Sequence, residues 1–242
     1  MIESGIARIL LARHGETEWN RESRMQGHLD SPLTDLGRAQ AEALAAALSG
    51  ERVGALVSSD LGRAVATARS VAARCGLELR LEPQLRERHF GICQGLTWEE
   101  LQERHPAAHA ALQARDPDFT PPGGESLRAF HARVVAGLTR IAERADGGRV
   151  AVIAHGGVIG IMYRHVQSIP LDAPRDYALP NASLNRFRFA GGRWQLEAWG
   201  DVSHLAAMRP GAADAAADDG SRVQASPGRA AGPAGGSGSS AI

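Results

Sequence analysis

Apolar runs alternate with helical patterns along most of this chain. Continuous apolar runs at 6–12, 53–58 and 150–154 predict buried strands, and an alternating run at 77–81 predicts another. Helical patterns separate them, at 35–49, 61–75, 98–105, 126–145 and 158–166. Continuous apolar strands that alternate with helices are typical of a sheet covered on both faces. The pattern therefore predicts an α/β fold.

The ends of these elements carry signals of their own. Thr34 is a candidate N-cap for the helix that follows it, Gly76 stops the next helix, and Pro106 ends the short one. The segments at 184–189 and 194–199 predict a β-hairpin, because Gly-Gly joins them. Trp194 and Trp199 lie on that hairpin, where we expect core packing or a dimer contact.

Composition changes sharply after Met208. Residues 209–242 are mainly Ala, Gly, Ser, Pro and Asp, which cannot bury enough apolar surface to offset the entropy lost on ordering. We therefore expect a folded domain over 1–208 and a disordered tail over 209–242.

Charge and cysteine usage limit the partners and the compartment. Lys plus Arg and Asp plus Glu number 27 each, so no general attraction to nucleic acid or membrane is expected. Cys75 and Cys93 lack metal-ligand spacing and are interpreted as free thiols in a reducing compartment. The chain shows neither the pattern of a signal peptide nor an apolar stretch of ~20 residues that could span a bilayer. We expect a cytoplasmic protein.

Polar residues follow three of the predicted strands. Arg13-His14-Gly15 follows the first, Ser58 and Ser59 follow the second with Arg63 one turn later, and His155-Gly156-Gly157 follows the strand at 150–154. Ligands of such sheets bind outside the carboxyl ends of the strands. Two histidines and two arginines should therefore meet at one edge.

This combination suits attack on a phosphomonoester. Neutral His14 can be the nucleophile, because Gly15 lets the backbone come close and hold the other ring N–H. Arg13 and Arg63 offer planar forks for phosphoryl oxygens, and protonated His155 would add a charged donor. An amide donor is available from Asn20, and Gly156 is expected to keep the pocket uncrowded.

The leaving oxygen needs a proton. Glu87, after the run at 77–81, is the best candidate, and the same carboxylate could later deprotonate water. Taken singly, an Arg-His-Gly or a Glu after a strand is a weak signal, since most such residues are structural or solvated. Their occurrence at successive strand ends is what favours catalysis.

The ordered series of motifs resembles the histidine phosphatase superfamily, the phosphoglycerate mutase-like group. The segments that carry the resemblance are 11–20 (LARHGETEWN), 26–27, 32–34, 58–64 (SSDLGRA), Glu87 with 90–91, 123–126 (GGES), 154–157 (AHGG) and 181–183 (NAS). It extends from about residue 8 to 205, so the domain over 1–208 would be the catalytic domain.

The resemblance implies a three-layer α/β/α sandwich with a mostly parallel sheet. It also implies phosphorylation of His14 within a phosphate site of Arg13, Arg63 and His155, with Glu87 as proton donor. Asn20, Gln26, Gly27 and Gly156 would contact the substrate. The family needs no metal, and we expect no cofactor.

The branch of the family is less sharply marked. The chain has no lysine and no Arg-Arg pair between Gly95 and Gly123, where glycolytic mutases carry them, and 154–159 resembles the phosphatases. Segment 89–95 looks mutase-like. We therefore expect a phosphatase of a small phosphorylated metabolite, with a phosphomutase and a non-catalytic phospho-ligand binder as alternatives, acting as a monomer or homodimer.

Four further residues are of types that can bind metals, but we expect other roles for them. His28 and Asp30 are expected in a loop at the pocket entrance, and His105 and His109 at the surface, because Pro106 breaks a continuous helix. The helix that begins at Trp98 is expected to be a lid over the pocket, and together with 105–122 it should set substrate choice.

Overall fold

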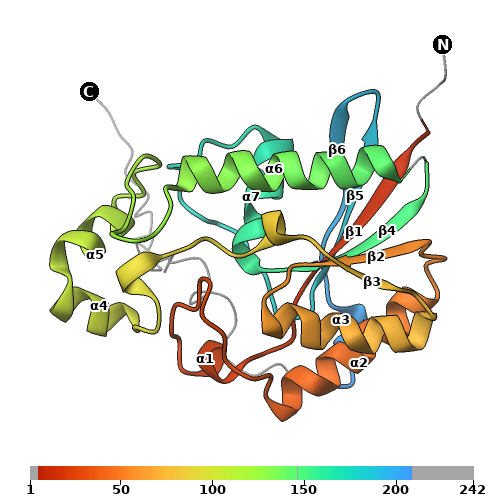
Figure 1. The fold of residues 1–242 in the computed structure, drawn as a ribbon, viewed down its shortest axis with the longest axis horizontal. Coiled ribbons are helices and arrows are strands. Elements are labelled where there is room, and N and C mark those ends of the chain that lie inside the picture. Colours follow the sequence, from red (N-terminus) through yellow and green to blue (C-terminus); the bar gives the residue numbers. More distant parts are fainter. Residues whose placement is uncertain (1–4, 146, 209–242) are drawn as a thin grey trace, which may run out of the picture.

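One mixed sheet organises the molecule (Figure 1). The computed structural model describes residues 5–145 and 147–208, and the predicted tail at 209–242 lies outside them. The elements, in chain order, are β1 (Ala7–Arg13), α1 (Glu18–Arg21), α2 (Asp35–Ser49), β2 (Ala55–Ser58), α3 (Gly62–Cys75), β3 (Leu79–Leu81), η1 (Pro83–Leu85), η2 (Gly91–Cys93), α4 (Trp98–Arg104), α5 (Pro106–Gln113), α6 (Leu127–Arg144), β4 (Arg149–Ala154), α7 (Gly156–Gln167), β5 (Leu184–Ala190), β6 (Arg193–Asp201) and η3 (Ser203–Leu205).

The sheet has six strands in the order β3-β2-β4-β1-β5-β6. The first four positions of that order are joined by parallel pairs, whereas β5 is antiparallel to both of its neighbours. This arrangement confirms the predicted α/β fold with a mostly parallel sheet. The predicted hairpin is also confirmed, and Gly191 and Gly192 turn it with φ angles of +55° and +74°, which glycine adopts without strain.

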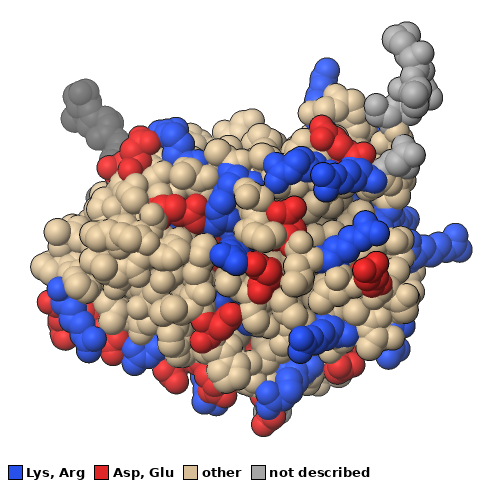
Figure 2. Space-filling view, viewed as in Figure 1, with Lys and Arg blue, Asp and Glu red and all other residues tan. Residues whose placement is uncertain are grey.

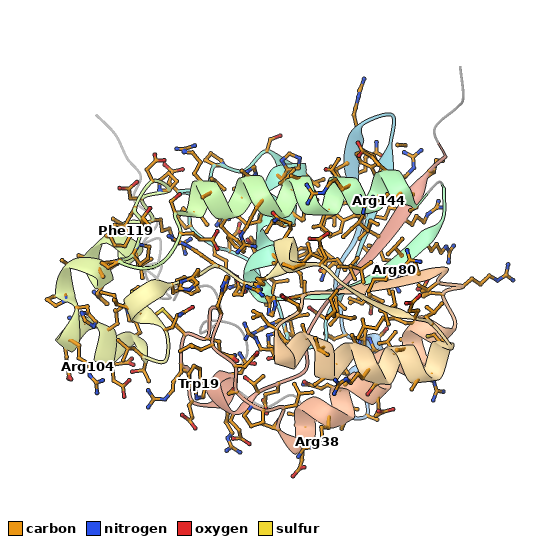
Figure 3. All side chains as sticks on the ribbon, viewed as in Figure 1. Trp19, Arg38, Arg80, Arg104, Phe119 and Arg144 are labelled. Carbon is orange, nitrogen blue, oxygen red and sulfur yellow. The ribbon has the colours of Figure 1, made fainter. Side chains whose placement is uncertain are left out.

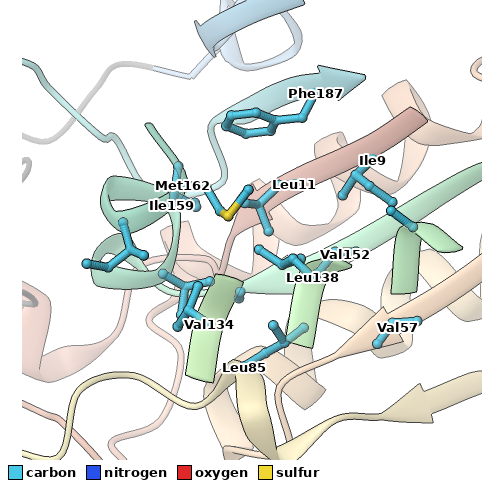
Figure 4. Packing of buried hydrophobic residues seen from close by; sticks show 14 of the residues in the cluster. Ile9, Leu11, Val57, Leu85, Val134, Leu138, Val152, Ile159, Met162 and Phe187 are labelled. Carbon is cyan, nitrogen blue, oxygen red and sulfur yellow. The ribbon is translucent and has the colours of Figure 1, made fainter. Parts of the chain in front are cut away.

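Helices cover both faces of the sheet. Side chains alternate across each strand, so Ile9 and Leu11 of β1 pack towards α6 and α7, whereas Leu10 packs towards α2 and α3. Figure 4 shows the first cluster, in which Leu138 of α6 and Met162 of α7 meet the strand side chains. Burial on both faces explains why these strands are continuous apolar runs in the sequence.

The predicted helices begin and end within two residues of where the sequence places them, but α5 was not predicted. Thr34 caps α2 by accepting the amide of Gly37, and Gly76 ends α3 with a φ of +66°. Pro106 has two effects, because α4 ends at Arg104 and α5 begins at Pro106 itself. Proline is well suited to the first turn of a helix, where its missing N–H costs nothing.

A third, smaller apolar cluster lies under α4 and α5. It contains Met25, Phe90 and Leu101, and Figures 1 and 3 show α4 and α5 with Phe119 at one end of the molecule. The expectation of a surface His109 is wrong: its side chain is 8% exposed and packs on Trp98 with 4.4 Å between ring centroids. The helix that begins at Pro106 turns this residue inward.

None of the helices in the described part of the chain is both long and apolar enough to cross a bilayer.

Candidate active site

The end of β1 delivers Arg13 and His14 to the carboxyl edge of the sheet. Both side chains are buried, and the amide of His14 continues the parallel ladder by donating to the carbonyl of Ala154 at 3.0 Å. Arg13 Nη1 donates to the carbonyl of Leu179, in the segment that leads to β5. The strand therefore determines the backbone position of the predicted nucleophile.

Two hydrogen bonds assign the tautomer of His14. Nε of Arg63 always carries a hydrogen, and it lies 3.2 Å from Nε2 of His14, so this nitrogen accepts and holds a lone pair. Nδ1 then carries the hydrogen and donates to the carbonyl of Gly15 at 2.8 Å. The nitrogen with the lone pair is the one that faces the arginine.

Backbone packing fixes the turn that follows His14. A Cβ on Gly15 would lie 2.3 Å from the carbonyl oxygen of Gly37, and a Cβ on Gly37 would lie 1.9 Å from that of Glu16. The amide of Gly15 donates to Oγ1 of Thr67 in α3 at 3.0 Å. These contacts clamp the turn between α2 and α3, so the His14 ring has a fixed support.

Arg63 lies in the first turn of α3 and is held by one loop. Its Nη2 donates to the carbonyl of Gly27 at 2.8 Å, and Nη1 donates to the carbonyl of Leu29 at 2.8 Å and to Asp30 at 2.9 Å. Asp30 also accepts the amide of Gly62, which caps α3. The expected loop at the pocket entrance thus holds the arginine, and its Asp30 is an ion-pair partner of Arg63.

His155 lies against His14 from the neighbouring strand. It follows β4, it is buried, and its ring centroid is 5.3 Å from that of His14. Nε2 of His155 lies 2.8 Å from Oγ of Ser59, which follows β2. This contact links the residues that follow β4 and β2.

Two buried side-chain amides lie near the site, Asn20 in the short helix α1 and Gln26 in the loop that follows it. The carboxamide oxygen of Asn20 accepts from Thr17 and from Asn181, each at 3.1 Å, which fixes the orientation of the amide. Within the described residues, Asn20 Nδ2 and Gln26 Nε2 have no hydrogen-bond partner. Buried donors of this kind are costly unless a ligand accepts from them.

Glu87 enters from the other side of the site. The side chain is buried, and its two oxygens accept the amides of Arg88 at 2.7 Å and of Gly157 at 2.8 Å. A Cβ on Gly157 would lie 2.1 Å from Oε1 of Glu87. Sequence reasoning assigned the uncrowding role to Gly156. The glycine on which the Glu87 carboxylate packs is Gly157.

The backbone of Glu87 is held as firmly as its carboxylate. His28 lies with Nε2 2.9 Å from the carbonyl oxygen of Glu87, and Arg133 Nη2 donates to the same oxygen at 2.8 Å. Burial lowers the pKa of His28 to about 4, and the charges of His89 and Arg133 act in the same direction. His28 is therefore neutral at pH 7, and its Nε2–H donates to this carbonyl.

A cleft opens beside Glu87. Its lining combines arginines with apolar side chains, among them Arg88, Arg115, Phe130, Ile161, Arg164 and Tyr177. Leu112 of α5, Arg115 and Asp116 line the cleft and belong to the segment 105–122, whereas α4, the predicted lid helix, contributes none of the lining residues. Among the described residues, no three His, Cys, Asp or Glu side chains gather where they could hold a metal ion.

The structure places the His14 ring against Arg63 and His155, and it places Glu87 against Gly157, which follows the same strand as His155. Sequence reasoning missed Asp30 and Arg133 as partners of the site, because both act through contacts with distant residues. Asn181 and Glu125 were visible only as motif positions, in Asn-Ala-Ser and Gly-Gly-Glu-Ser.

The fold and the site together define the class of the protein: an α/β protein whose buried arginines, histidines and amide donors suit a phosphoryl group. The sequence pattern of the histidine phosphatase superfamily (branch 1) matches residues 9–202. The chain belongs to this superfamily, and it is an enzyme of the family.

Individual relatives agree with this assignment. The chain is 43% identical over 203 residues to phosphoglycerate mutase-like protein 4 of Arabidopsis thaliana, covering 82% of this chain and 87% of the relative. It is 40% identical over 210 residues to the metal-independent phosphoserine phosphatase of the same plant, covering 86% and 87%. A mycobacterial glucosyl-3-phosphoglycerate phosphatase, solved with VO₃, superposes with a TM-score of 0.68 at 37% identity, covering 80% of this chain and 98% of that one.

Proposed function

We propose that this protein is a metal-independent phosphomonoesterase that hydrolyses a small phosphorylated metabolite through a phosphohistidine on His14. The observation that carries the proposal is the buried His14 ring, whose Nε2 holds a lone pair opposite the guanidinium of Arg63. Two phosphatases of small phosphorylated compounds among the similar proteins support the hydrolytic reaction.

In the first step, the substrate phosphoryl group enters between His14 and Arg63. Nε of Arg63 then donates to a phosphoryl oxygen instead of His14, and Arg13, Asn20 and His155 donate to the others. Nε2 of His14 attacks phosphorus while the bond to the leaving oxygen breaks. The electron pair stays on that oxygen, which takes a proton from the Glu87 carboxyl group.

The second step frees the enzyme. The Glu87 carboxylate takes a proton from water, and the water oxygen attacks phosphorus as the bond to Nε2 breaks. Inorganic phosphate leaves, Nε2 regains its lone pair and Glu87 is again protonated. The hydrogen bond from Nδ1 to Gly15 keeps the ring in one orientation throughout.

The leaving group of the substrate occupies the cleft beside Glu87. Arg115 and Arg164 with the apolar floor suit a compact organic group that bears polar or anionic substituents. The relatives that act on phosphoserine and glucosyl-3-phosphoglycerate support this size class.

The test is release of inorganic phosphate from a panel of monoesters in EDTA. The panel contains p-nitrophenyl phosphate, 3-phosphoglycerate, sugar phosphates and phosphoserine. We expect release that survives EDTA and falls at least about 10³-fold in His14→Ala. His165→Ala, an exposed histidine in the last turn of α7, should be unchanged. Activity that survives in His14→Ala would contradict the covalent mechanism.

A phosphomutase is the second candidate, favoured by the similarity to phosphoglycerate mutase-like protein 4. It would transfer the phosphoryl group between substrate oxygens faster than to water. Conversion of 3-phosphoglycerate in the presence of a bisphosphoglycerate primer, without phosphate release, would replace hydrolysis by this activity.

We also propose that residues 1–208 are the catalytic domain and that the protein works in the cytoplasm. Cys75 and Cys93 are free thiols, and burial raises the pKa of Cys93 to about 11, so this thiol is unreactive.

Figure 2 shows arginine and acidic side chains interspersed over one face, which supports the absence of a nucleic-acid or membrane partner. Light scattering after gel filtration would distinguish a monomer from a homodimer.

A further inference from the structure

The segment that carries Glu87 has little secondary structure of its own. Residues 86–89 lie between the two short 3₁₀ helices η1 and η2. Buried carbonyl and amide groups in such a segment need partners from elsewhere in the fold. Their partners determine where the Glu87 side chain begins.

Arg133 supplies most of these partners. Its Nη1 donates to the carbonyls of Gln84 at 2.9 Å and of Arg86 at 2.8 Å, and Nη2 donates to that of Glu87 at 2.8 Å. Its Nε donates to Glu125 at 2.9 Å, and Nη2 also pairs with this carboxylate. All five N–H donors of the guanidinium are therefore used.

Glu125 extends the same network to the far side of Glu87. Its Oε1 accepts the amide of His89 at 2.9 Å. Burial acts to raise the pKa of Glu125, but the hydrogen bonds and charge of Arg133 hold it below its usual value. The Arg133 and Glu125 side chains are only 19% and 18% exposed. Because the pair is largely buried, the cost of removing two charges from water offsets most of their attraction, so the pair contributes little net stability by itself. Its main effect is on the position of the groups that it holds.

The arginine is anchored in a rigid element. It lies in the second turn of α6, an 18-residue helix, with its guanidinium 4.8 Å from the ring centroid of Phe130. One turn further along, a Cβ on Gly137 would lie 3.0 Å from Cβ of Gln84. The helix thus packs directly against the segment that its arginine holds.

We propose that Arg133 and Glu125 are a positioning pair that places the Glu87 carboxyl group against the leaving oxygen. This inference rests on the proposed function, in which Glu87 donates the proton. Arg88, whose amide orients the Glu87 carboxylate, lies in the same held segment. A displacement of about 1 Å in a catalytic group can cost about 10²-fold in rate. The pair therefore controls proton donation and leaves attack by His14 untouched.

The experiment compares two substrates in Arg133→Gln. p-Nitrophenyl phosphate hardly needs a proton on its leaving group, whereas the alkyl monoester that the wild type hydrolyses best does. We expect kcat/KM for the alkyl ester to fall about 10- to 100-fold, and kcat/KM for p-nitrophenyl phosphate to fall less than about 3-fold. The ratio kcat/KM reports phosphoryl transfer to His14 and excludes the later attack of water, in which Glu87 also takes part for both substrates. Arg133→Lys, which keeps the charge and three donors, should restore part of the loss.

The matched control is Arg128→Gln in the same helix. Arg128 makes a similar bidentate pair with Asp118, at 2.6 and 2.9 Å, but the two side chains are 60% and 66% exposed. This variant should leave both substrates unchanged. Glu125→Gln is the milder second variant, and it decides the question if Arg133→Gln fails to fold by circular dichroism.

A double variant tests whether Arg133 acts through Glu87. Adding Arg133→Gln to Glu87→Gln should lower the alkyl-ester rate by less than about 3-fold, because the group being positioned is already gone. Equal losses of kcat/KM on both substrates, or losses that multiply in the double variant, would overturn the positioning role. Phosphate release that does not depend on His14 would instead overturn the proposed function.

Discussion

The guanidinium of Arg63 reaches both His14, the proposed nucleophile, and the loop at the pocket entrance. One edge donates to His14, and the other donates to Gly27, Leu29 and Asp30. A side chain of such length would otherwise sample many rotamers. The ion pair with Asp30 therefore matters less for its energy than for the position that it imposes on the arginine.

The variant Asp30→Asn tests whether this ion pair acts by positioning Arg63. The amide keeps the shape of the carboxylate but loses its charge, so Arg63 is held less firmly against the phosphoryl group. We expect kcat to fall about 10-fold for p-nitrophenyl phosphate and alkyl esters alike, since the phosphoryl group is common to both. Asp118→Asn, in the exposed pair with Arg128, should have no effect. A loss confined to alkyl esters would place Asp30 with the proton donor instead.

At the scale of elements, two glycines set the distance between β1 and α2. The turn after β1 and the first turn of α2 touch backbone to backbone at Gly15 and Gly37. No side chain could be accommodated at this contact without moving the helix or the strand. The packing of α2 thus contributes directly to the position of His14.

We predict that Gly37→Ala destabilises the fold by about 2–4 kcal/mol. Activity should fall as well, because the substitution displaces the turn that supports His14. Gly50→Ala, at the other end of the same helix, is the control. Its Cβ would meet nothing closer than 3.5 Å and its φ is −80°, so stability should change by less than about 0.5 kcal/mol. Urea denaturation measures both. Equal stability of the two variants would contradict the close contact.

Sequence patterns predicted the elements whose ends carry local signals, such as Thr34 and Gly76. The helix after Pro106 was missed because proline marks both a stop and a start. Arg13, His14, Arg63 and His155 could be placed together from strand ends alone. The roles of Arg133 and Asp30 could not, because their contacts join residues 30 or more positions apart and depend on how α6 and the loop pack.

At the scale of the whole molecule, histidines make stability depend on pH. Partial burial lowers the pKa of His28 to about 4, and it also lowers the pKa values of His131 and His204. Between about 4 and 6.5 the unfolded chain then binds more protons than the folded one. Their stabilising contribution is complete above pH 6.5 and is lost as the pH falls through this window.

We therefore expect the Tm to be several degrees lower at pH 5 than at pH 7.5, since each kcal/mol shifts Tm by about 2–4 °C in a chain of this size. His28→Gln should reduce the difference because it removes the group with the largest shift. Differential scanning calorimetry in buffers of matched ionic strength measures it. A Tm that is flat or rises on acidification would contradict neutral buried histidines.

The central position of β1 in the sheet has a consequence for synthesis. This strand leaves the ribosome first, yet its neighbours β4 and β5 are made more than a hundred residues later. Such long-range pairing folds slowly and only when both partners are present. A nascent chain therefore carries the His14 imidazole without its sheet until translation of the domain is almost complete. Fragments that stop before β5 should therefore be inactive and dependent on chaperones. The enzyme should not hydrolyse cellular phosphoesters until synthesis of the domain is complete.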